Sequence, residues 1–166
     1  MVDLEIHPVR LGEAPALGAA GNQDGYVRDR LARQSGGRGL LLAAWLGPVA
    51  VGSVYLWLEP AEEPEIRLHL PGTPLITHLE VFEGHRNQRI GTRLVETAEQ
   101  LLRDRGHKSA ALAVELSNEG AKRLYKRLGY QDWDFGRVDC VQRDWLADGT
   151  LVENLEECTV LVKLLG

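Results

Sequence analysis

Basic, amide and small side chains gather in one short stretch of the sequence, from Arg86 to Thr92. It reads Arg-Asn-Gln-Arg-Ile-Gly-Thr, and an extended run rich in Leu, Ile, Thr and Val precedes it, from Pro74 to Val81. Apolar residues then repeat at helical spacing as far as Gly106. The first backbone N–H groups of a helix lack internal partners and lie at the positive end of its dipole. The pattern therefore predicts an anion-binding loop between a strand and a helix.

Gly91, inside this stretch, has no Cβ, so the backbone can approach a pyrophosphate closely. Neither G-x-G-x-x-G nor G-x-x-x-x-G-K-[ST] follows the strand, which argues against a Rossmann or P-loop nucleotide site. The alternative interpretation is an ordinary helix start with solvated arginines. The stretch alone thus indicates a site for a diphosphate-sized anion of another kind.

The rest of the chain supplies elements in an order typical of a single α/β domain over residues 1–166. Expected strands cover 2–6, 40–46, 49–58, 75–81, 109–114, 130–135 and 159–165, and expected helices cover 90–105 and 118–128, with one or two more in 11–34. Two successive strand–helix units imply a parallel pair of strands with a right-handed crossover. The acidic segment 59–65 is expected to be a loop, explained by solvation or by a role in binding substrate.

The composition is that of a soluble globular protein, with 44% hydrophobic and 26% charged residues among 166. The net charge of -5 argues against nucleic acid as the main partner. No apolar run approaches the ~20 residues that cross a bilayer, and the first residues do not resemble a signal peptide, so we expect a cytoplasmic protein without membrane contact. Cys140 and Cys158 have no metal-type spacing, which predicts free thiols and no metal site.

Two motifs in this order resemble those of the GNAT superfamily of N-acetyltransferases, and Leu79-Glu80-Val81 precedes them. Arg86 to Leu94 resembles [RQ]-x-x-G-x-[GA], except that Arg89 stands where the first glycine is usual. This departure is tolerable if the Arg89 backbone stays helical and its side chain points into solvent. Asn118 to Tyr130 matches N-x-x-A-x-x-L-Y-x-x-L-G-[FY] at every fixed position.

The resemblance implies a mixed, mostly antiparallel sheet of six to seven strands flanked by about four helices. It also implies a V-shaped splay between the strands near 75–81 and 109–114, with acetyl-CoA bound in it as co-substrate. The residues that would bind acetyl-CoA are Leu79, Glu80, Val81, Asn87, Gln88, Arg89, Ile90, Gly91, Thr92 and Asn118. Backbone groups of 79–81 would hold the pantetheine arm, and those of 87–92 the pyrophosphate. Asn118 would bind the pantetheine chain, or serve only as a helix cap.

Tyr125 matches the tyrosine that protonates the departing thiolate in this superfamily; the alternative is a core aromatic residue. The base that deprotonates the amine could be His78, Glu80 or Glu115. Alternation along strand 75–81 would put His78 and Glu80 on the opposite face from the odd-numbered residues, where relatives often carry the base. Glu115 shares a face with Ala113, the position of the catalytic glutamate in the ribosomal-protein acetyltransferase branch. We therefore expect Tyr125 and Glu115 to be catalytic.

The function that this resemblance implies is acetyl transfer from acetyl-CoA to an amine by direct attack. The acidic composition favours a small cationic acceptor, possible examples being aminoglycoside-like molecules. A protein N-terminus or peptide is the alternative acceptor, and a non-catalytic acyl-CoA-binding sensor is the alternative from outside the enzymes. Four tryptophans and an apolar C-terminal strand pair lead us to expect a homodimer.

Overall fold

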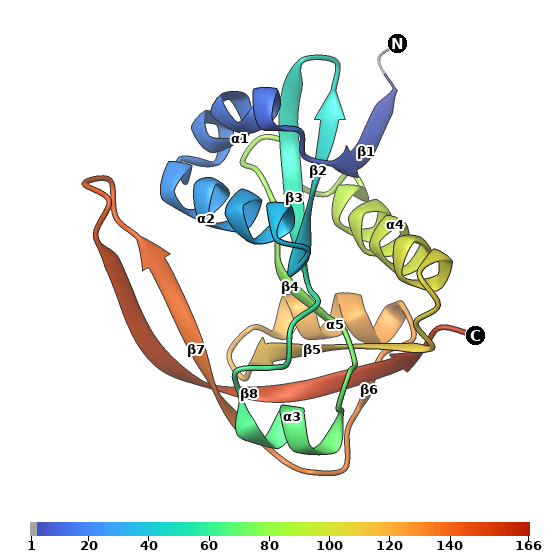
Figure 1. The fold of residues 1–166 in the computed structure, drawn as a ribbon. Coiled ribbons are helices and arrows are strands. Elements are labelled where there is room, and N and C mark those ends of the chain that lie inside the picture. The colour runs from blue at the N-terminus through green and yellow to red at the C-terminus, as the bar shows by residue number, and fades with distance from the viewer. Residues whose placement is uncertain (1–2) are drawn as a thin grey trace.

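A single twisted sheet organises the computed structural model, which describes residues 3–166 (Figure 1). Its strands are β1 Leu4–Pro8, β2 Gly39–Leu46, β3 Val49–Trp57, β4 Leu75–Val81, β5 Ser109–Glu115, β6 Gln131–Asp132, β7 Val138–Trp145 and β8 Leu151–Leu164. The helices are η1 Leu11–Glu13, α1 Ala14–Gly21, α2 Asp24–Ser35, α3 Pro64–His69, α4 Ile90–Asp104 and α5 Glu119–Arg127. Val2, expected to begin the first strand, lies outside the described residues.

The strand order is β1-β2-β3-β4-β5-β8-β6, and β7 pairs with β8. All recorded pairings are antiparallel except that of β4 with β5, so the predicted mixed, mostly antiparallel α/β fold is confirmed. Eight strands occur between residues 3 and 166, against six to seven expected. The extra strand is β7, which the sequence did not reveal because its four apolar residues do not alternate regularly with its four polar ones.

Apolar side chains form two clusters, one on each face of the sheet. Helices α1, α2 and α3 contribute to the first cluster, and α4 and α5 to the second. The predicted stripe of α4 is confirmed, because Leu94, Val95, Ala98 and Leu102 are all fully buried. The sheet is therefore covered on both faces, and each face presents different elements to a ligand.

A β-bulge interrupts β4 at His78. Tyr55 of β3 pairs with Thr77 and Ser53 pairs with Glu80, so β4 carries one residue more than β3 over this interval. The extra residue is accommodated at His78, whose backbone is left-handed with a φ of 51°. The expected alternation is therefore wrong beyond Thr77: His78 and Glu80 take the face of Thr77, and the other residues after the bulge turn to the opposite face.

The packing around β4 supports this change of face. Ile76, before the bulge, belongs to the cluster under α4 and α5, and Leu79 and Val81 pack against the same cluster. Leu75, before the bulge, and Phe82, after the strand, belong to the other cluster. Even-numbered residues thus face α4 before the bulge and odd-numbered residues do so after it.

Strands β7 and β8 form a long hairpin that projects from the body of the molecule beside α2 (Figure 1). A turn at Asp148-Gly149 joins them, and the strand expected at 159–165 extends back to Leu151. Cys140 and Cys158, on these two strands, are buried free thiols, as predicted. Within residues 3–166, no helix combines the length and the apolar character that crossing a membrane requires.

Candidate active site

The loop before α4 has the backbone geometry of an anion-binding nest. Asn87 and Arg89 both have positive φ values, of 64° and 62°. The first helical hydrogen bond is donated by the Arg93 N–H to the Arg89 carbonyl, at 3.1 Å. The N–H groups of 90–92 precede that bond and can therefore serve a ligand at the positive end of the helix.

Arg89 does not meet the condition of a helical backbone, although its side chain is exposed. Its backbone is left-handed, with φ 62° and ψ 17°, and not right-handed helical. A left-handed residue carries a steric cost that glycine avoids, which explains why glycine is usual at this place in the superfamily motif. Here an arginine occupies this left-handed position.

Gly91 lies where α4 faces both β4 and α5. A Cβ placed on it would be 3.6 Å from Val81 and 3.8 Å from both Leu79 and Leu124. These are ordinary van der Waals distances, so one methyl group fits and a larger side chain would extend toward the surrounding walls. Gly91 therefore keeps the space between these elements open.

The predicted splay between β4 and β5 is confirmed by the strand register. The two strands pair only at Leu75 and Ala111. Beyond this point β4 remains paired with β3 as far as Val81, and β5 remains paired with β8 as far as Glu115. The facing edges of β4 and β5 are thus unpaired with each other, which leaves backbone groups of 79–81 for a ligand. The Val81 carbonyl meanwhile accepts a hydrogen bond from Arg86 Nε, at 3.1 Å.

Tyr125 is both a buried aromatic residue and a protonated phenol. Its side chain belongs to the cluster under α4 and α5, and its ring meets that of Tyr130 edge to face at 5.6 Å. Burial raises the pKa of Tyr125 well above its ordinary value, so the hydroxyl stays protonated at neutral pH. Asn118 caps α5 as predicted, since its Oδ1 accepts from the Ala121 N–H at 3.1 Å.

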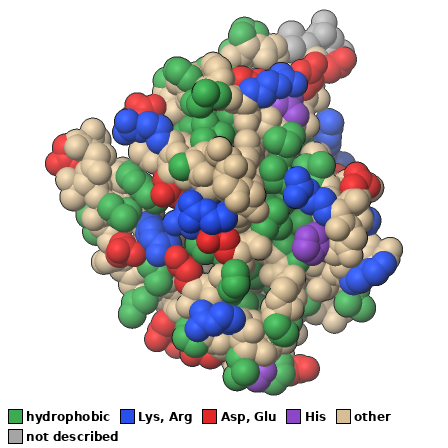
Figure 2. All heavy atoms as spheres, viewed as in Figure 1, with side chains coloured by type: hydrophobic (Ala, Val, Ile, Leu, Met, Phe, Trp, Pro, Cys, Tyr) green, Lys and Arg blue, Asp and Glu red, His purple; other side chains and the backbone are tan. Residues whose placement is uncertain are grey.

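A pocket opens on the face of the sheet that α1, α2 and α3 cover, opposite α4 and α5. It lies near the point where β4 and β5 diverge. It contains about 850 Å³ of empty space, part of it open to solvent. Its lining residues are Tyr26, Arg30, Trp57, Glu62, Glu63, Ile66, Leu75, Ile76, Thr77, His78, Ala113, Cys140, Val141, Gln142 and Arg143. Basic and acidic side chains meet near the middle of the face seen in Figure 2.

The bulge brings His78 into this pocket. Its ring stacks on Tyr26, with centroids 4.2 Å apart and planes at 26°. Glu80 Oε1 lies 3.5 Å from His78 Nε2, so a carboxylate faces the imidazole. Glu115, at the end of β5, is half-buried and, within residues 3–166, does not line the pocket.

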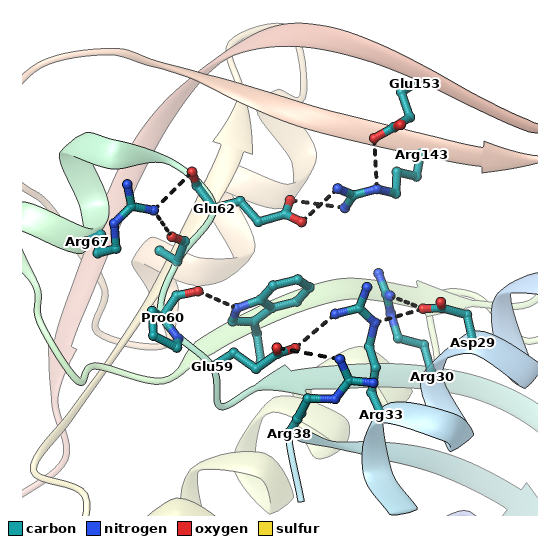
Figure 3. Close-up of polar contacts among 12 residues, drawn as sticks. Asp29, Arg30, Arg33, Arg38, Glu59, Pro60, Glu62, Arg67, Arg143 and Glu153 are labelled. Atoms are coloured by element: carbon teal, nitrogen blue, oxygen red, sulfur yellow. Dashed lines mark hydrogen bonds and ion pairs between the residues drawn. The ribbon is translucent and has the colours of Figure 1, made fainter. Parts of the chain in front are cut away.

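Ion pairs tie the walls of the pocket together (Figure 3). Arg143 of β7 makes a bidentate contact with Glu62, at 2.7 and 3.0 Å, and also contacts Glu153 of β8 at 3.0 Å. On α2, Arg30 contacts Asp29 at 2.6 Å. The hairpin is thereby fastened to the acidic segment before α3.

Sequence reasoning singled out the acidic segment 59–65, which contains Glu62, but not Arg30 or Arg143. Glu62 and Arg143 are 81 positions apart, and no local motif connects them. The acidic segment 59–65 was the available signal, because repeated carboxylates in a loop need either water or distant basic partners. The short helix α3, which begins at Pro64, also replaces part of that expected loop.

Comparisons with known proteins agree with this geometry. A model of the acetyltransferase (GNAT) family matches residues 12–130, which is more than half of the chain. A segment of 74 residues is 35% identical to N-acetyltransferase 8 of Rattus norvegicus, covering 45% of this chain and 32% of that protein, and the Mus musculus protein gives the same figures. The chain therefore spans about a third of the length of these curated relatives.

Solved structures share the fold at low sequence identity. The ribosomal-protein-S18-alanine N-acetyltransferase of Escherichia coli has a TM-score of 0.68 and 16% identity, over 99% of this chain and 95% of that one. A GNAT family acetyltransferase from Elizabethkingia anophelis, with acetyl-CoA bound, has a TM-score of 0.63 and 18% identity, over 97% of each chain. From the family match, together with the splayed strands and the nest before α4, we conclude that the chain belongs to the GNAT family of acetyltransferases.

Proposed function

We propose that this protein transfers the acetyl group of acetyl-CoA to an amine held in the pocket beside His78. The observation that carries the proposal is the splay of β4 from β5 after Leu75. The pocket begins beside this point, since Leu75, Thr77 and Ala113 line it, and the nest before α4 follows the far end of β4. Solved GNAT neighbours with acetyl-CoA bound support the choice of acyl donor.

The residues at these two places have the chemistry that acetyl transfer needs. The nest takes the pyrophosphate, and the free edge of 79–81 orients the thioester carbonyl. A base removes a proton as the amine nitrogen bonds to the carbonyl carbon, and the C–S bond then breaks. Tyr125 gives its proton to the sulfur and regains one from the base through solvent.

His78, assisted by Glu80, is our proposed base. It lines the pocket, and the carboxylate of Glu80 can orient the imidazole and stabilise it after protonation. Glu115 remains the second candidate, acting through water from the end of β5. A left-handed histidine in a strand also fits a functional role, since such conformations concentrate at active sites.

A partly enclosed pocket favours a small amine over a folded protein as acceptor. A small cationic molecule, including an aminoglycoside-like one, agrees with the net charge of -5. Release of free thiol in the presence of an amine tests this proposal directly. Acetyl-CoA binding without thiol release for any amine would instead favour a sensor, and release only with peptides would favour the N-terminal acceptor.

Acetyl-CoA should stabilise the protein, whereas NAD and ATP should not. At 100 times its dissociation constant, a ligand adds about 2.7 kcal/mol, which raises Tm by about 5 to 10 °C in a chain of this size. Differential scanning fluorimetry measures this shift. Absence of a shift at millimolar acetyl-CoA would contradict the donor assignment.

Gly91→Val is expected to abolish the acetyl-CoA shift because its branches enter the space bounded by Leu79 and Leu124. Gly91→Ala is the matched control, since its methyl group meets neighbours only at van der Waals distance. The Tm values of both unliganded variants should stay close to that of the natural protein.

We also propose a homodimer. The hairpin of β7 and β8 exposes several large apolar side chains, with Leu146, Leu151 and Leu155 exposed by 49%, 42% and 68%. Light scattering should return twice the 18.4 kDa mass of the chain. A monomer mass at tens of micromolar protein would refute the dimer.

A further inference from the structure

The charged residues that line the pocket differ in whether they have an ion-pair partner. Arg143 is bound by Glu62, and Arg30 by Asp29. The remaining charged side chain of the lining is Glu63, at the start of α3. No basic side chain within residues 3–166 forms an ion pair with it.

Glu63 is half-buried, so water can solvate its carboxylate only in part and does not fully compensate for the lack of a basic partner. Burial raises the pKa of its carboxyl above the ordinary value, and the nearby charge of Glu62 acts in the same direction. Backbone N–H groups, its own and that of Val141, and the Arg143 charge lower it, so the net shift stays upward. Binding of an additional cation beside the Glu63 carboxylate would therefore be favoured.

Part of the pocket wall suits an alkyl chain. Ile66 and Leu75 supply aliphatic surface, and Trp57 supplies an aromatic wall. Such surfaces bind methylene groups by removing them from water. The pocket therefore combines these apolar side chains with one carboxylate that has no ion-pair partner among residues 3–166.

The reacting nitrogen cannot be the cation that Glu63 recognises. An amine attacks a thioester only as the free base, so its charge has been lost by the time it reacts. We infer that the acceptor carries a second, non-reacting ammonium group, which Glu63 binds, so that the substrate class is an alkyl diamine or a similar polyamine. This inference rests on the proposed acetyl transfer and deepens it.

Matched acceptors test the inference because they differ only at the far end of the chain. Putrescine, n-butylamine and 4-aminobutanoate carry an ammonium, a methyl and a carboxylate group there, and cadaverine with n-pentylamine extends the comparison by one methylene. We expect kcat/KM for the diamines to exceed that for the monoamines by about tenfold or more, mainly through a lower KM. Preference for 4-aminobutanoate would overturn the inference and point to Arg30 or Arg143 as the recognition group.

Glu63→Gln should remove the preference for diamines while leaving turnover of n-butylamine within a factor of about three. Glu63→Asp, which keeps the charge, should restore part of the preference. Glu65→Gln is the matched control because Glu65 is exposed on the same short helix and does not line the pocket. An equal loss for diamine and monoamine would show that Glu63 has a structural or basic role, and would overturn the inference.

Binding provides a readout that does not depend on turnover. With coenzyme A present, putrescine should raise Tm for the natural protein and for Glu65→Gln, but not for Glu63→Gln. If putrescine binds in this way but is not acetylated, the proposed acetyl transfer fails and the cation site stands. If monoamines are acetylated and putrescine shows no advantage in binding or rate, the cation site fails and acetyl transfer stands.

Discussion

Tyr125→Phe should lower kcat by about 10²- to 10⁴-fold, the range typical of general acid catalysis, with an accepted amine as substrate. The substitution removes the proton that the sulfur needs as the C–S bond breaks. The phenylalanine ring keeps its packing in the cluster under α4 and α5 and its edge-to-face contact with Tyr130. Steady-state kinetics of thiol release measure the loss, and the acetyl-CoA shift in Tm should persist.

Tyr130→Phe is the matched control for this prediction. The Tyr130 hydroxyl donates to the buried Glu99 carboxylate at 2.7 Å, and Lys163 Nζ donates to the same carboxylate at 3.0 Å. Removing the Tyr130 hydroxyl should destabilise the protein by about 1 to 3 kcal/mol, because a buried acceptor loses one of its donors. It should leave kcat nearly unchanged.

The two variants therefore predict opposite patterns. A Tyr125→Phe protein with natural turnover and reduced stability would show that Tyr125 is only a core residue. A large loss of kcat in Tyr130→Phe would show that the assay reports packing in this cluster and not proton transfer. Tyr125→Ala is a poor test because it also removes the buried ring, at a cost of about 3 to 5 kcal/mol.

His78→Asn should lower kcat/KM by about 10²- to 10⁴-fold, because it removes the imidazole that accepts the proton of the amine. Asparagine is suited to this position since it tolerates the left-handed backbone better than most residues, and His78 has a φ of 51°. The bulge and the acetyl-CoA shift in Tm should therefore be preserved. Initial rates with the best amine of the matched set measure the effect.

Glu80→Gln and Glu115→Gln separate the candidates for the base. If His78 is the base, Glu80→Gln should cause a smaller loss than His78→Asn, because it removes only the group that faces the imidazole at 3.5 Å. Glu115→Gln should then have little effect. A large loss in Glu115→Gln with full activity in His78→Asn would assign the base to Glu115, as the sequence analysis expected.

Local features of the site followed from the sequence. The apolar spacing from Ile90 to Leu102 produced the observed buried stripe of α4, because a helix of period 3.6 has one side available for the sheet. Asn118 caps α5 as its motif predicts. The motifs also led to the correct family. Each of these features depends on neighbours within a few positions along the chain.

The tertiary structure decided which residues share the pocket. A single extra residue at His78 reverses the alternation of β4, and only the pairing with β3 reveals that residue. The left-handed turn at Arg89 was likewise not evident from the sequence, because arginine rarely adopts this backbone conformation. Glu63 acquired its significance only when the folded hairpin placed Arg143 on Glu62 and left the neighbouring carboxylate without a basic partner in the described chain. Register and long-range charge pairing depend on contacts between distant segments. For this reason the sequence determined most of the elements, whereas the fold determined the face and the partner of each side chain.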